Sequence, residues 1–183
     1  MRIFGIGLSR TGTTSLTHAL VHVGINMIHY PTKKQLFDPA IKAAADIPVA
    51  RYFKELDVEF PNSKFIYTTR NKDRWLVSME GHFTKYKLGG INEWFKENRR
   101  EVYGSLEFDK DLYAQVFDSH DKAVREYFKD KDNLLILNIT AGDGWDELLS
   151  FLELSDKKIT IDFPHKRRTA KNKNYKYLHI ENT

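Results

Sequence analysis

The sequence predicts an α/β fold with a mainly parallel central sheet flanked by helices, formed by one domain over residues 1–183. Short apolar and β-branched runs alternate with longer segments that carry apolar residues at helical spacing. The run LLILNI at 134–139 is nearly all apolar, as expected for a strand covered on both faces. The chain has 183 residues, 41% of them hydrophobic, which suffices for one sizeable core, and it shows no linker or internal repeat.

The first half of the chain alternates between the two element types. An apolar run at 3–6 predicts the first strand, and apolar residues at helical spacing predict a helix that ends before Gly24. The mixed run 25–30, stopped by Pro31, predicts a second strand. Residues 33–45 are expected to form a helix that is interrupted near Pro39. Pro48 then suits the first turn of another helix, which ends before 61–62.

The second half continues the pattern. The β-branched and aromatic run KFIYTT at 64–69 predicts the third strand. Asn71 is a suitable cap for the next helix, and two glycines end it. The remaining expected elements are helices at 72–87, 91–103, 112–129 and 145–154, with the fourth strand at 134–139.

The loop at 7–14 joins the first strand to its helix and has the composition of a phosphate-binding loop. Backbone amides of such a loop and of the first helical turn converge on one point, where the helix dipole favours an anion. Aligned with the pattern G-x-x-x-x-G-K-[ST], the loop reads GLSRTGTT, so Thr13 occupies the position of the lysine in nucleotide hydrolases. The loop carries its cation at Arg10 instead.

This loop resembles the 5′-phosphosulfate-binding loop of the PAPS-dependent sulfotransferases, a family with the P-loop fold. The resemblance implies that the 5′-phosphosulfate of 3′-phosphoadenosine 5′-phosphosulfate (PAPS) is bound by Ser9, Arg10, Thr11, Gly12, Thr13 and Thr14. It further implies a catalytic role for Arg10, which would stabilise charge on the bridging oxygen as adenosine 3′,5′-bisphosphate leaves.

The segment KFIYTTRNKDRWLVS resembles the second signature of the same family, in which an arginine and a serine eight residues later hold the 3′-phosphate. Arg70 and Ser78 have this spacing. A guanidinium offers a planar fork of donors to a phosphate, and a hydroxyl can donate to a further oxygen. The cytosolic branch also closes an Arg-Lys-Gly segment over the 3′-phosphate, which this chain lacks. Arg167, within the basic stretch 165–177, is expected to supply that charge, unless the stretch is a solvated tail.

The catalytic base is open between several residues. Asp46 precedes Pro48 about where a base lies in the cytosolic enzymes, but its pKa must be raised for this role, and it is equally suited to cap the following helix. His18, one turn after Thr14, and His29 are the alternatives. His18 and His22 lie four residues apart, yet no third ligand accompanies them, so we predict no metal site.

Taken together, these features predict a sulfotransferase that moves a sulfuryl group from PAPS to a hydroxyl or amine of a small-molecule acceptor. A nucleotide kinase or NTPase, or a non-catalytic nucleotide or nucleic-acid binder, is the alternative. The net charge of +4 suits a phosphorylated ligand without requiring nucleic acid, and we expect no nucleic-acid partner. Without cysteines, a leader-like segment or an apolar run that could span a membrane, the chain is expected to be cytoplasmic. Aromatic side chains such as Trp75 and Tyr103 are expected in the core or around the acceptor.

Overall fold

The computed structural model describes residues 1–83 and 92–165 and contains a five-stranded sheet in which every pairing is parallel. The strand order is β2-β3-β1-β4-β5. The strands are β1 (Ile3–Gly5), β2 (Ile28–His29), β3 (Ala43–Ala45), β4 (Lys64–Thr68) and β5 (Leu134–Leu137). The expected α/β fold with a parallel sheet is confirmed.

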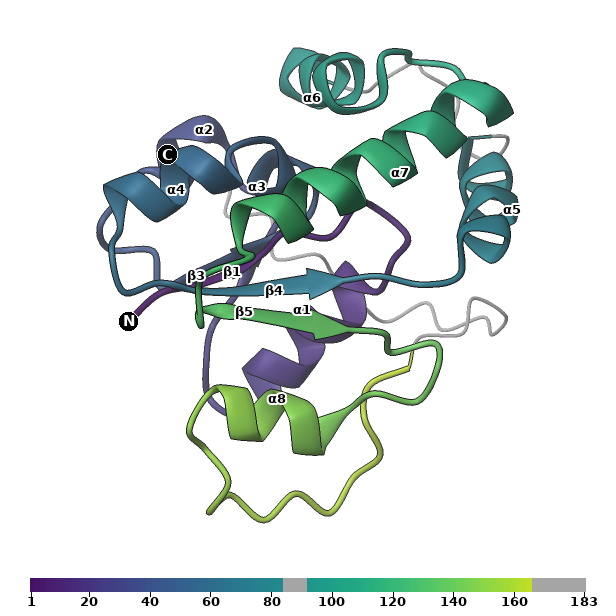
Figure 1. Ribbon diagram of the computed structural model, residues 1–183. Helices are drawn as coiled ribbons and strands as arrows, with labels where there is room; N and C mark the ends of the chain where they lie inside the picture. The colour runs from purple at the N-terminus through teal and green to yellow at the C-terminus, as the bar shows by residue number, and fades with distance from the viewer. Residues whose placement is uncertain (84–91, 166–183) are drawn as a thin grey trace.

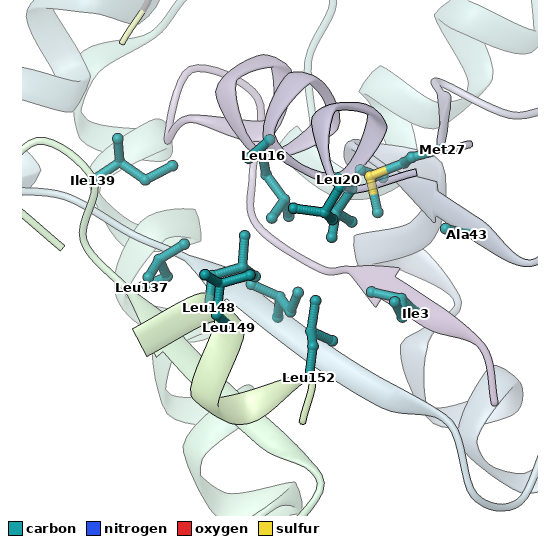
Figure 2. Close-up of a cluster of buried hydrophobic side chains, with 14 residues drawn as sticks. Ile3, Leu16, Leu20, Met27, Ala43, Leu137, Ile139, Leu148, Leu149 and Leu152 are labelled. Atoms are coloured by element: carbon teal, nitrogen blue, oxygen red, sulfur yellow. The ribbon is translucent and has the colours of Figure 1, made fainter. Parts of the chain in front are cut away.

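Helices cover both faces of this sheet (Figure 1). The helices are α1 (Thr13–His22), α2 (Lys33–Leu36), α3 (Ile47–Arg51), α4 (Phe53–Glu59), α5 (Lys72–Phe83), α6 (Glu93–Tyr103), α7 (Lys110–Tyr127) and α8 (Trp145–Phe151). On one face, α1 and α8 bury leucines against the sheet, as Figure 2 shows. On the other face, α2, α3, α4 and α7 pack against aromatic residues of β1 and β4.

A third cluster lies beyond the carboxyl ends of the strands and joins α5, α6 and α7 to the loop after β1. Leu8 from the loop packs there with Trp75, Tyr103 and Tyr113, all of them buried. In a parallel sheet, ligands bind at this edge. The third cluster is therefore the structure that supports the candidate site.

The prediction of an interrupted helix over 33–45 is correct for its first part and wrong for the part after Pro39. Residues 33–36 form the short helix α2, and Ala43–Ala45 form β3, which lies between β1 and β2. Alanine is the strongest helix former, so its local preference favoured a helix. Tertiary packing overrides that preference here, because β3 is fully buried.

Small residues are required where β3 lies beside β1. A Cβ atom added at Gly5 would lie 2.8 Å from Cβ of Ala45 and 3.0 Å from Cδ2 of Leu16. Larger side chains at these positions would separate α1 from the sheet.

The second strand is also shorter than expected, since only Ile28–His29 pair. The helix that Pro48 begins is interrupted at Tyr52, which separates α3 from α4.

We predict that Gly5→Ala lowers the free energy of unfolding by about 1–3 kcal/mol, because the added methyl group overpacks the contact with Ala45. Urea denaturation measures the change. Gly81→Ala is the matched control, since Gly81 lies in α5 and nothing occupies the 4 Å around its added Cβ. That substitution is expected to be neutral or to stabilise by up to about 1 kcal/mol. Equal losses in both variants would contradict the packing argument.

Candidate functional site

The loop between β1 and α1 is fixed by close contact with the end of β4. A Cβ atom at Gly7 would lie 2.0 Å from Oγ1 of Thr68, so only glycine fits at this position. Oγ1 of Thr11 lies 2.8 Å from Oγ1 of Thr68 and donates to the carbonyl of Leu8 at 2.7 Å. Gly12 has a φ of 121°, a backbone conformation that favours glycine. The glycines of the phosphate-loop pattern therefore serve the shape of the loop.

Two buried aromatic residues hold Ser9, the residue at the tip of the loop. The indole Nε1 of Trp75 on α5 donates to the carbonyl of Ser9 at 2.9 Å. The amide of Ser9 donates to the hydroxyl of Tyr103 on α6 at 3.0 Å. Both aromatic side chains are at most 1% exposed. Of the two expected locations for Trp75 and Tyr103, the structure shows the core, and it adds a role in positioning the loop.

Asp46 is the polar centre of the site. Its carboxylate accepts from the Ser9 hydroxyl at 2.6 Å, from the Thr13 hydroxyl at 3.0 Å and from the Ile47 amide at 2.7 Å. It also lies 2.9 Å from Nε2 of His29 at the end of β2. Asp46 caps α3 with a φ of 88°, a strained conformation for a residue other than glycine. The expected capping role is confirmed, and the same carboxylate joins the loop to β2.

The pKa values of Asp46 and His29 are displaced in opposite directions. Burial alone would raise the pKa of Asp46, but the charge and hydrogen bond of His29 and the further hydrogen bonds lower it to about 2. Burial would lower the pKa of His29, but Asp46 outweighs it and the pKa is raised above 6.5. The His29 interaction therefore stabilises the fold fully below pH 6.5 and is lost as the pH rises through the raised pKa. The contribution of Asp46 is present above its ordinary pKa and is lost as the pH falls toward 2.

His29 also lies beside the loop hydroxyls. Its Nε2 is 3.3 Å from Oγ1 of Thr13 and 3.3 Å from Oγ1 of Thr14. His18 is half-buried on α1, four residues beyond Thr14. Of the candidate bases, Asp46 and His29 form one hydrogen-bonded unit at the loop. The raised pKa that Asp46 would need as a base is absent.

The arginines lie on the opposite side of the loop, toward β4. Nη1 of Arg70 donates to the carbonyl of Arg10 at 3.1 Å, and Nε of Arg10 donates to the hydroxyl of Ser78 at 3.1 Å. Because β1 and β4 are neighbours, the loop and Arg70 share one edge of the sheet. The structure thus brings together Arg10, Arg70 and Ser78, which are far apart in the sequence.

A shallow pocket of about 430 Å³ opens beside these residues. It is lined by Arg70, Asp73, Arg74, Val77 and Ser78. Nε of Arg70 is buried there without a hydrogen-bond partner among the described residues. Burial and the neighbouring charge of Arg74 both lower the pKa of Arg70, as expected for two cations that face one space. The sequence analysis missed Arg74, although its spacing of four from Ser78 indicates a shared face of α5.

The remaining candidates add little to this geometry. Arg167 lies outside the described residues. Within residues 1–83 and 92–165, no three His, Asp or Glu side chains form a group that could hold a metal ion. No helix in this part of the chain has the length and apolar character to span a membrane.

Comparisons with known proteins agree with the fold and indicate a family. A family model described as a sulfotransferase domain matches the chain in two overlapping segments, residues 2–38 and 31–172. The Ava biosynthesis cluster protein M of Aspergillus versicolor is 24% identical over 214 residues of alignment, which covers 90% of this chain and 80% of that protein.

We predict that Tyr103→Phe lowers the free energy of unfolding by about 1–3 kcal/mol, because the Ser9 amide loses its acceptor. Thermal and urea denaturation measure the loss. Tyr113→Phe is the matched control. Tyr113 stacks on Tyr103 with ring centroids 4.9 Å apart and is equally buried, but its hydroxyl has no partner among the described residues. Its removal is expected to be neutral or stabilising, and the opposite order of the two variants would contradict the anchoring role.

Proposed function

Since this chain belongs to the sulfotransferase family, we propose that it transfers a sulfuryl group from PAPS to a hydroxyl or amine of a small acceptor. The observation that supports the proposal is that one residue, Arg10, links the loop to the pocket beside Arg70. Arg10 lies in the phosphate loop, and its side chain reaches Ser78 in the second pocket. PAPS carries two separate anionic groups on its ribose, whereas ATP carries one chain of phosphates.

The described residues suit such a donor. In the proposed complex, the loop amides and the hydroxyls of Thr13 and Thr14 bind the 5′-phosphosulfate, aided by the dipole of α1. Arg70 and Ser78 bind the 3′-phosphate, and Arg74 adds a second guanidinium to the same pocket. The unpaired Nε of Arg70 supports this assignment, since a buried donor without a partner is costly unless a ligand completes it.

The donor supplies the activated sulfuryl group, and the chain supplies position, charge and a proton acceptor. The acceptor oxygen forms a bond to sulfur, the bond from sulfur to the bridging oxygen breaks, and adenosine 3′,5′-bisphosphate leaves with that oxygen. We assign the stabilisation of the leaving oxygen to Arg10 and the loop amides. The positioning of the acceptor against the sulfuryl group supplies the remainder of the rate enhancement.

We propose that the His29–Asp46 pair, rather than Asp46 alone, takes the proton from the acceptor. A carboxylate with a pKa near 2 is a weak base, whereas an imidazole with a pKa above 6.5 matches neutral pH. Asp46 then keeps His29 oriented and stabilises its protonated form. Because the two groups interact closely, the apparent pKa values describe the pair.

The donor site is tested by thermal shift. Adenosine 3′,5′-bisphosphate at about 100 times its Kd is expected to stabilise the protein by about 2.7 kcal/mol, and ATP with Mg²⁺ is expected to stabilise it far less. Arg70→Ala should reduce the shift caused by the bisphosphate and leave the smaller shift caused by AMP, which lacks the 3′-phosphate. Arg125→Ala, on α7, removes a cation elsewhere and serves as the control. A response to ATP alone would overturn the proposal in favour of an NTPase.

The proton acceptor is tested by the pH dependence of kcat/KM. In the wild type, activity should fall as the pH drops through the raised pKa of His29, because the protonated pair accepts no further proton. Asp46→Asn removes the partner that raises this pKa, so burial should place it below 6.5, as NMR titration of the His29 ring would show. His29→Gln should lower kcat by about 10²–10⁴-fold. His22→Gln, on the exposed side of α1, is the control. A wild-type profile unchanged by His29→Gln would contradict the assignment.

A further inference from the structure

Arg99 on α6 is a buried arginine that contacts Phe83, a residue packed against the third cluster. Its side chain is covered so completely that the residue is only 3% exposed. The guanidinium carbon lies 4.3 Å from the centre of the Phe83 ring and 5.0 Å from that of Phe95. These rings shield the cation from water on two sides and hold it in one orientation.

No carboxylate pairs with this cation among the described residues. Nη2 of Arg99 lies 3.3 Å from Nε2 of His82, while Nη1 is buried without a hydrogen-bond partner in the same part of the chain. Residues 84–91, which follow Phe83 in the sequence, contain no Asp or Glu. Burial lowers the pKa of Arg99, which reflects the cost of a charge removed from water. A buried guanidinium with one unpaired nitrogen and no direct ion pair among the described residues indicates an anion that arrives with a ligand.

The position of Arg99 places that ligand on the His29–Asp46 side of the loop. Phe95 and Arg99 are four residues apart on α6 and therefore share a face of the helix. On that face, Phe95 stacks on Tyr30 with ring centroids 4.3 Å apart, and Tyr30 follows His29 directly. Helix α6 also packs against α3, which Asp46 caps, and the charge of Asp46 acts on Arg99.

The donor pocket lies elsewhere. Its arginines, Arg70 and Arg74, belong to the end of β4 and the start of α5. In the strand order, β4 lies on one side of β1, and β3 and β2 lie on the other. Arg99 contacts α5 only near its end, through His82 and Phe83, whereas the pocket residues of α5 lie earlier in the helix, at 73–78. Through Phe95 and Tyr30, Arg99 is linked to the strand that carries the proposed base.

We propose that the acceptor carries a carboxylate in addition to the hydroxyl that receives the sulfuryl group, and that Arg99 binds this carboxylate through Nη1. The inference rests on the proposed sulfotransferase function. A guanidinium already fixed between two rings offers its donors to a carboxylate with little loss of side-chain freedom. The carboxylate remains unchanged in the reaction and serves to orient the hydroxyl toward the His29–Asp46 pair.

The binding test uses two pairs of probes that differ only in charge: 4-hydroxybenzoate with 4-hydroxybenzamide, and 4-hydroxybutyrate with 4-hydroxybutyramide. Thermal shifts are measured with adenosine 3′,5′-bisphosphate present. In the wild type, at least one acid should raise the Tm more than its amide. Arg99→Met should abolish this difference, and Arg100→Met, an exposed neighbour on the same helix, should retain it. Arg99→Lys, which keeps the charge, should retain part of it and provides a second variant if Arg99→Met fails to fold.

The kinetic test uses PAPS with the same probes. The ratio of kcat/KM for an acid to that for its amide should fall by about 30-fold or more in Arg99→Met, as for a buried charge pair that loses one partner. No preference for either acid in the wild type would overturn the inference, and so would a preference that survives Arg99→Met. Loss of the bisphosphate shift in Arg99→Met would also overturn it, since Arg99 would then serve the donor. Failure of the proposed function itself is recognised separately, by a wild type that the bisphosphate does not stabilise.

Discussion

The hydrogen-bonded carboxylate of Asp46 is the interaction on which the site depends. It joins three segments that are distant in the sequence: the loop through Ser9 and Thr13, the end of β2 through His29, and the start of α3 through its own cap. A buried carboxylate needs this many partners to remain ionised. The strained backbone at Asp46 is tolerated because these partners determine its position together.

A second constraint is steric: two glycines, Gly5 and Gly7, lie in close contact with the neighbouring strands. The phosphate loop holds its shape because Gly7 touches β4 and Gly5 touches β3, which lets α1 pack closely on the sheet through Leu16. The leucines of α1 and α8 then fill the space beneath β1 (Figure 2). The chemistry at the loop and the packing of one whole face of the sheet therefore depend on the same few small residues.

Much of this architecture could be predicted from local sequence. The loop and the Arg70–Ser78 pair are visible as spacings within short segments, and the apolar run of β5 reveals its burial. Strand β3 could not be predicted, because three alanines favour a helix and only contact with Gly5 explains their role. Nor could the anchoring of Ser9 by Tyr103, which lies 94 residues away. Arg99 could not be singled out either, because its importance depends on burial and on an Nη1 that has no partner among the described residues.

Helix α6 carries Tyr103, which holds the loop, and Arg99, whose guanidinium lies against Phe83 and Phe95, within little more than one helical turn. Replacement of α6 by the corresponding helix of a relative would change Tyr103 and Arg99 together. Under the proposed function, a chimaera that adopts a new α6 to accept a different molecule would also loosen the loop that is proposed to bind the donor, unless it kept the tyrosine. If Arg99 binds the acceptor as proposed, changes of acceptor are confined to the turn before Tyr103, because the turn that ends the helix is hydrogen-bonded to Ser9.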